Sequence, residues 1–235
     1  MSISPLLTRG GLTRPEKSEL LSSMAIFQDL SPEQMESLDS STRTITVDKG
    51  RVVFEPDTTG EGLFLLKSGK VQLYRLSPEG KKFILDTVGP GTFFGEMAFV
   101  GQGMYGAFAE CIEPAAICVM SRHDLERLIL EIPMVGIRFM ETMAGRLDGA
   151  ETRLEDLAFK SLAGRLASLL VRMVEPGSNE VAGLTHNDMA ETVGTSRETA
   201  TQALNDLKSR GLINIRRMRI EIVDMDGLID VAETY

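Results

Sequence analysis

The stretch LTHNDMAETVGTSRETATQALNDLKSRGLI, residues 184–213, decides how the second half of the chain folds. Two runs with apolar residues at helical spacing flank Gly194, a residue type that readily adopts the left-handed conformation of a sharp turn. The pattern therefore predicts two short helices joined by a tight turn, a helix-turn-helix. The inner face of the pair is expected to contain Leu184, Met189, Ala190, Val193, Ala203, Leu204 and Leu207.

The start of the second helix carries residues suited to reading DNA. Thr195 or Ser196 can cap the helix, and Glu198 places an acidic group in its first turn. In a docked recognition helix these turns meet base edges in the major groove, where Arg can bind guanine through two hydrogen bonds and Glu can accept from cytosine. The outward-facing candidates are Ser196, Arg197, Thr199, Ala200 and Gln202.

Charge supports the same interpretation. The chain of 235 residues has a net charge of −9, which argues against non-specific binding of polyanions by the whole molecule. Residues 195–219 reverse the sign, with six basic and two acidic side chains. The strands predicted on either side of Arg217 and Met218 form a hairpin, or wing, which would bring basic side chains to the phosphate backbone. These wing residues are Arg216, Arg217 and Arg219. Two alternatives remain. Arg197 and Glu198 could form an ordinary solvated surface pair, or the helix-turn-helix could dock a protein.

The earlier part of the chain has a different character. Residues 42–120 contain short runs rich in Val, Ile, Phe and Thr between turn signals, a pattern typical of a β-sandwich or barrel. Before it, Ser31, Pro32 and Gln34 form the start signal of a helix. The expected divisions of the chain are a flexible arm at 1–20, an effector-sensing β-domain at 21–132, a long helix at 133–158 and a winged-helix domain at 159–235, in which 175–183 is a loop.

The long helix carries an apolar seam. Met140, Leu147 and Leu154 are spaced by seven residues, and a second series at the same spacing is offset by three: Met143, Ala150 and Leu157. Such a repeat is typical of a helix that pairs with a copy of itself, so we expect a parallel homodimer contact. Burial of the seam against the chain's own β-domain is the alternative.

Several classes of function lack support in the sequence. No apolar run approaches the ~20 residues of a membrane span, and the first residues do not form a signal peptide, so we expect a cytoplasmic protein with no membrane contact. Two cysteines and two histidines are too few for a disulfide framework, a four-ligand zinc site or a haem site. No nucleophile–base spacing, Walker loop or metal motif indicates catalysis, so we expect neither catalytic nor metal-binding residues.

The chain resembles the cyclic-AMP receptor protein/FNR (CRP/FNR) family of bacterial transcription regulators. The resemblance rests on KSGKVQLY at 67–74, PGTFFGEM at 90–97, the long helix before LAFKSLAGRLASLL, and VGTSRETATQALNDLKSRGLI at 193–213. It implies an α+β fold with a cyclic-nucleotide-binding β jelly roll, a long dimerisation helix and a C-terminal winged helix-turn-helix. It also implies a homodimer that binds double-stranded DNA at near-palindromic sites and works with RNA polymerase.

The resemblance assigns roles to individual residues. Arg197 and Glu198 match the family's base-reading pair, which implies a TGTGA-like half-site. Gln202 stands where cyclic-AMP receptors have a third reader, an Arg, so the remaining position of that half-site is open. The DNA-binding residues expected from both arguments are Thr195, Ser196, Arg197, Glu198, Thr199, Gln202, Arg216, Arg217 and Arg219.

The same resemblance places an effector pocket in the β-domain. Family members that bind cyclic AMP use a loop that begins Gly-Glu and ends Arg-Ser or Arg-Thr. Here Tyr105 and Gly106 occupy the Arg-Ser place, and no Lys or Arg lies between Lys82 and Arg122. A phosphate would find no cation in this segment, which argues against cyclic AMP. The pocket candidates are Gly95, Glu96, Met97, Tyr105, Gly106 and Ala107.

Three interpretations of the effector remain open. The pocket takes a different small molecule, or it takes none, or the domain senses redox state. In the redox interpretation a hairpin turning at Glu113–Pro114 sets Cys111 opposite Cys118. Two buried, apolar cysteines are the alternative that the sequence favours. The FNR branch carries an iron–sulfur cluster on cysteines near the N-terminus, and this chain has none there. A small-molecule-binding or scaffold protein whose winged helix docks a protein is the rival function.

Overall fold

The computed structural model describes residues 24–56, 62–96 and 107–234. The chain divides into two compact units, Met1–Ala144 and Gly145–Tyr235. The division falls inside the long helix α4 (Pro133–Phe159), so that this helix contributes turns to both units. The arm expected at 1–20 lies outside the described residues.

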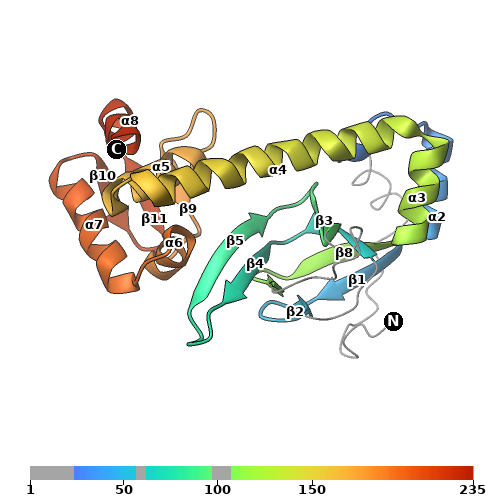
Figure 1. The fold of residues 1–235 in the computed structure, drawn as a ribbon, viewed down its shortest axis with the longest axis horizontal. Coiled ribbons are helices and arrows are strands. Elements are labelled where there is room, and N and C mark those ends of the chain that lie inside the picture. The colour runs from blue at the N-terminus through green and yellow to red at the C-terminus, as the bar shows by residue number, and fades with distance from the viewer. Residues whose placement is uncertain (1–23, 57–61, 97–106, 235) are drawn as a thin grey trace. The chain divides into compact units, whose positions relative to one another are not determined.

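The first unit contains two antiparallel four-stranded sheets (Figure 1). One sheet has the strand order β1 (Arg43–Val47), β8 (Ala115–Ser121), β3 (Gly62–Ser68) and β6 (Phe93–Phe94). The other has the order β2 (Val52–Phe54), β7 (Phe108–Cys111), β4 (Val71–Leu76) and β5 (Lys82–Val88). Strands that are adjacent in the sequence thus often lie in different sheets, as in a jelly roll.

Strand β3 shows how the sequence builds two layers of core. Alternate side chains of a strand point to opposite faces of its sheet. Phe64 and Leu66 belong to the cluster between the two sheets, whereas Leu63 and Leu65 belong to a cluster on the other face. The rings of Phe64 and Phe94 stack between the sheets with centroids 5.2 Å apart. The predicted β-domain is therefore confirmed, with a sandwich core.

Helices cover the second face of the β1–β8–β3–β6 sheet. They are η1 (Ala25–Phe27), α2 (Pro32–Ser41), α3 (Arg122–Glu131) and the first turns of α4. The predicted start of α2 is confirmed, because the Ser31 hydroxyl accepts from the backbone N–H of Gln34 and the Gln34 side chain accepts from that of Ser31. Val135 anchors α4 in the same cluster.

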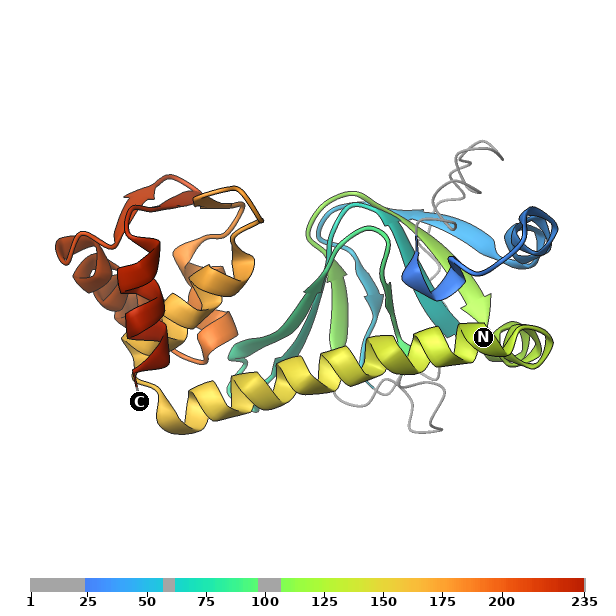
Figure 2. The ribbon, with the colours of Figure 1, turned by 90° about the horizontal axis from the view of Figure 1, so that it is seen from above.

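The second unit is a winged helix-turn-helix domain (Figures 1 and 2). After α4 it contains α5 (Leu162–Met173), β9 (Glu180–Ala182), α6 (His186–Val193), α7 (Arg197–Ser209), β10 (Ile213–Arg216), β11 (Arg219–Ile222) and α8 (Met225–Glu233). The description of 175–183 as a loop was incomplete, because β9 pairs with β11 and adds a third strand to the wing sheet. Val181 explains this strand, since its side chain is buried in the domain core.

The cysteine hairpin of the redox interpretation is wrong. Cys111 ends β7 and lies opposite Val71 of β4, whereas Cys118 lies in β8 opposite Leu65 of β3, in the other sheet. The turn at Pro114 carries the chain from one sheet to the other, so β7 and β8 do not pair. Both thiols are free and buried, and burial raises the pKa of Cys111 to about 12, with a smaller contribution from the nearby Glu110 carboxylate. The alternative of two buried cysteines is confirmed.

Candidate nucleic-acid interface

The turn between α6 and α7 has the predicted geometry. Thr185 caps α6, its hydroxyl accepting from the backbone N–H of Asp188 while the Asp188 carboxylate accepts from that of Thr185. Gly194 ends α6 in the left-handed conformation, with φ +72°. Ser196 is the cap of α7, and its hydroxyl accepts from the backbone N–H of Thr199 at 3.2 Å. The choice left open between Thr195 and Ser196 is thereby decided.

The first turns of α7 present polar side chains outward. The exposed ones are Ser196, Arg197, Glu198, Thr199 and Gln202, and Thr195 is half-buried. Ala200 was expected on this face, and that prediction is wrong because Ala200 is fully buried. Its position four residues before Leu204 and seven before Leu207 places it on the inner stripe of the helix.

Electrostatics keep Glu198 charged. Its own backbone N–H and the Ser196 hydroxyl donate to the carboxylate and lower its pKa, with a smaller contribution from the charge of Arg197. The group also lies in the first turn, where the helix dipole favours negative charge. At neutral pH the first turn of α7 therefore presents one cationic hydrogen-bond donor and one anionic acceptor side by side.

Contacts behind the exposed face hold α7 rigidly. Leu204 and Leu207 are fully buried in the domain core. The ring Nδ1 of His186 lies 3.0 Å from the Thr201 hydroxyl, which ties α6 to α7. Arg165 of α5 donates to the backbone carbonyl of Val193 at 2.9 Å, at the C-terminal end of α6. A helix held in this way would lose little conformational freedom if it bound a partner.

The wing presents all three predicted arginines on its surface. Arg216 pairs with Glu221 at 3.2 Å and Arg219 pairs with Glu180 at 3.2 Å. Exposed ion pairs contribute only about 0–1 kcal/mol, so a phosphate can replace either carboxylate at little cost. Arg217 lies in the two-residue turn between β10 and β11, beside Met218, whose φ is +58°.

The seam residues of α4 do not all share one environment. Leu147 is 60% exposed and Leu154 is 66% exposed, and Met140, Ala150 and Leu157 are also exposed. Met143 differs, because it is half-buried and packs with Phe139 against the core of the first unit. The alternative interpretation, burial of the seam against the β-domain, therefore holds for Met143 alone, and the other five seam residues form an exposed apolar stripe.

Three of the effector candidates are described, Gly95 and Glu96 directly after β6 and Ala107 directly before β7. Gly95 is buried with φ +90°, a conformation that requires glycine, and Glu96 and Ala107 are half-buried. Met97, Tyr105 and Gly106 lie outside the described residues.

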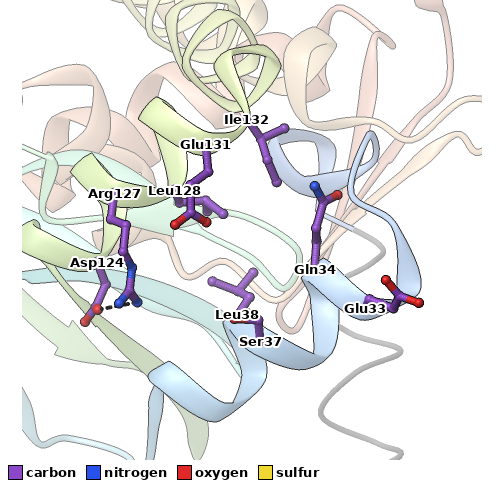
Figure 3. Close-up of a pocket in the computed structure, with 9 residues that line it drawn as sticks. All are labelled: Glu33, Gln34, Ser37, Leu38, Asp124, Arg127, Leu128, Glu131 and Ile132. Carbon is purple, nitrogen blue, oxygen red and sulfur yellow. Dashed lines mark hydrogen bonds and ion pairs between the residues drawn. The ribbon is translucent and has the colours of Figure 1, made fainter.

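A groove of about 230 Å³ lies elsewhere, between α2 and α3, and contains none of the candidates (Figure 3). It is lined by Glu33, Gln34, Ser37, Leu38, Asp124, Arg127, Leu128, Glu131 and Ile132. No cluster of potential metal ligands occurs among the described residues, and none of the described helices is long and apolar enough to cross a membrane.

Sequence reasoning missed two buried charges. Lys67 in β3 is 2% exposed, and Asp156 in α4 is 4% exposed. The sequence gives no sign that Lys67 is buried, because the residue lies next to the turn signal Ser68–Gly69, where an exposed lysine is common. Asp156 gives a weak one: Lys160 follows four residues later, a spacing at which opposite charges meet on a helix.

Comparisons with known proteins agree with both units. The cyclic nucleotide-binding domain family matches residues 44–131, and the Crp-like helix-turn-helix domain family matches residues 164–231. The chain is 29% identical over 207 residues to a "Cyclic AMP receptor protein" from Thermus thermophilus, covering 88% of this chain and 96% of that protein. It is 29% identical over 217 residues to a "CRP-like cAMP-activated global transcriptional regulator" from Mycobacterium tuberculosis, covering 89% and 97%.

Solved structures match the chain in fold. A CRP/FNR-family transcriptional regulator from Thermus thermophilus matches with 27% identity and a TM-score of 0.68, covering 82% of this chain and 99% of that one. A CooA mutant from Carboxydothermus hydrogenoformans matches in fold with 24% identity and a TM-score of 0.77, covering 92% and 99%. With its cyclic-nucleotide-binding fold followed by a Crp-like helix-turn-helix, the chain belongs to the CRP/FNR family of transcription regulators.

Proposed function

We propose that the protein is a homodimeric, sequence-specific DNA-binding regulator that reads a near-palindromic site through Arg197 and Glu198. The observation that carries the proposal is the first turn of α7, where these two side chains are exposed while the inner face of the helix is buried in the domain core. Arg197 would bind a guanine, Glu198 would accept from a cytosine, and the wing arginines would bind phosphates. Gln202 would read a third base in place of the family's Arg.

The uncovered stripe of α4 supports the homodimer. Leu147 and Leu154 stand seven residues apart with most of their surface in solvent. A second copy of the same helix would bury both, in the parallel pairing that a seven-residue repeat favours. Two-fold symmetry of the protein then requires an inverted repeat in the DNA, with half-sites one or more helical turns apart.

Regulation would come from a ligand other than cyclic AMP, with RNA polymerase as the protein partner. The two relatives described above are named for cyclic AMP. In this chain the segment between Lys82 and Arg122 has no cationic side chain to hold a cyclic phosphate, and the Arg-Ser place holds Tyr105 and Gly106. A neutral or aromatic effector suits these residues better.

A salt titration tests DNA reading. Binding of the full chain to a palindromic TGTGA-type duplex is measured from low to physiological salt against a scrambled duplex of equal length. We expect specific binding whose logarithm falls linearly with the logarithm of salt concentration, with a slope of about −0.9 for each phosphate contacted. Equal binding to both duplexes would refute sequence reading. Failure to bind any duplex would favour a scaffold that docks a protein through its winged helix.

A further inference from the structure

Asp156 is the one buried carboxylate among residues 24–38, 42–56, 62–96 and 107–234. It lies in the last turns of α4, and each of its two oxygens contacts a different cation. Oδ1 is 2.7 Å from Lys160 Nζ, and Oδ2 accepts from Arg172 Nη1 at 2.8 Å. Burial opposes its ionisation, but the hydrogen bonds from Lys160 and Arg172 outweigh that effect and hold the pKa of Asp156 below its usual value.

The contacts of Asp156 join three helices. Lys160 is the first residue after α4, and Arg172 lies in the last turn of α5. Lys160 Nζ also donates to the Ser168 hydroxyl at 3.0 Å, and this hydroxyl donates to the backbone carbonyl of Ala232 in α8 at 3.4 Å. We call Asp156, Lys160, Ser168 and Arg172 the Asp156 clasp. It lies where the chain leaves the seam-bearing helix and enters the helix-turn-helix domain.

The clasp and the seam use different sides of the same turns. Asp156 is buried against α5, while its neighbours Leu154 and Leu157 remain exposed. Each residue advances an α-helix by about 100°, so two apolar side chains this close in sequence can face away from a buried carboxylate between them. These turns of α4 can therefore hold a dimer partner on one side and the DNA-binding domain on the other.

A buried ion pair adds little net stability, because desolvation cancels most of the attraction. It does specify geometry, since charged hydrogen bonds are short and directional. A carboxylate that is held by cations from two segments permits only a narrow range of angles between the helices.

We propose that Asp156 is a positioning residue that holds the helix-turn-helix domain at a defined angle to the dimerising turns of α4. In the dimer this angle sets the distance between the two recognition helices, and so the spacing of half-sites that the protein accepts. The proposal rests on the proposed function, because it needs a dimer that reads two half-sites. Asp156 touches no base in this account, and its effect on DNA passes through the orientation of α7.

The test compares Asp156→Asn with Glu155→Gln, an exposed neighbour that loses the same charge. Affinity of the full chain is measured for its preferred inverted repeat, for repeats lengthened or shortened by one base pair, and for a single half-site. In Asp156→Asn we expect the preference for the correct spacing to fall by at least about fivefold, with half-site affinity unchanged. Glu155→Gln should keep the wild-type preference.

Two results would overturn the proposal. One is a folded Asp156→Asn protein that keeps the full spacing preference. The other is a parallel loss of half-site affinity, because a damaged domain, and not a changed angle, would then explain the defect. If Asp156→Asn does not fold, Arg172→Gln replaces it, because Arg172 is more exposed and its loss leaves the Asp156–Lys160 pair intact, and Arg172→Lys should restore the preference. A wild-type chain that reads no inverted repeat would refute the proposed function, and this inference with it.

Discussion

The substitution Leu147→Glu tests the homodimer seam. Leu147 is 60% exposed in the single chain, and complete burial of a leucine side chain contributes about 2 kcal/mol. Burial of the exposed part therefore contributes about 1.2 kcal/mol per protomer, and about 2.5 kcal/mol for both copies of a symmetric seam. The dissociation constant of the dimer should therefore rise at least about fiftyfold. Repulsion between the two glutamates of a symmetric seam should raise it further.

Sedimentation equilibrium over a range of protein concentrations measures this change directly. The wild type should sediment as a dimer of 25.8 kDa chains at concentrations where Leu147→Glu is monomeric. Thr152→Glu is the matched control, because it adds the same charge to an exposed position of α4 away from the seam. An unchanged dissociation constant for Leu147→Glu, or an equal weakening by Thr152→Glu, would refute the reasoning.

Three further predictions concern the fold. Gly69→Ala should lower the free energy of unfolding in urea by about 2–4 kcal/mol, because φ is +81° and the new Cβ would lie 2.2 Å from the Pro114 carbonyl oxygen. Gly80→Ala, at φ +79° with open space around the Cβ, should cost only about 1 kcal/mol, and equal losses would contradict the steric argument. Cys111, with its raised pKa, should resist thiol reagents at pH 8 until the protein unfolds; rapid labelling of native protein, measured by mass spectrometry, would show that it is accessible. Because the pKa of Asp156 is lower in the folded state, its ionisation stabilises the fold above about pH 4 and this contribution is lost as pH falls further. In unfolding followed from pH 6 to pH 3, the stability difference between wild type and Asp156→Asn should therefore shrink as the pH falls below about 4, and a constant difference would count against this reasoning.

The sequence predicted local features well where a single residue type decides them. Gly194 as the turn, Ser31 as a cap and the alternating strands of the β-domain follow from backbone preference and side-chain period. Ala200 was misplaced because its small, apolar side chain suits either face of a helix, and only packing against the domain core shows which face it takes.

Features that depend on distant contacts were not predictable. The hairpin proposed for Cys111 and Cys118 assumed that neighbouring strands pair, but the turn at Pro114 leads into the other sheet. The role of Asp156 depends on Arg172, sixteen residues away on another helix. Met143 fits the seven-residue repeat as well as Leu147 does. Only the structure shows that Met143 is half-buried against the core of the first unit.

Selection from random duplexes, done in parallel with the wild-type chain and Arg197→Ala, tests the central claim most directly. The wild type should enrich an inverted repeat with a guanine at one position of each half-site. Arg197→Ala should lose the preference for that guanine, at a cost of about 1–3 kcal/mol, and keep the preferences at the other positions. Enrichment of no inverted repeat by the wild type, or a uniform loss across all sequences in the variant, would contradict the claim that α7 reads bases through Arg197.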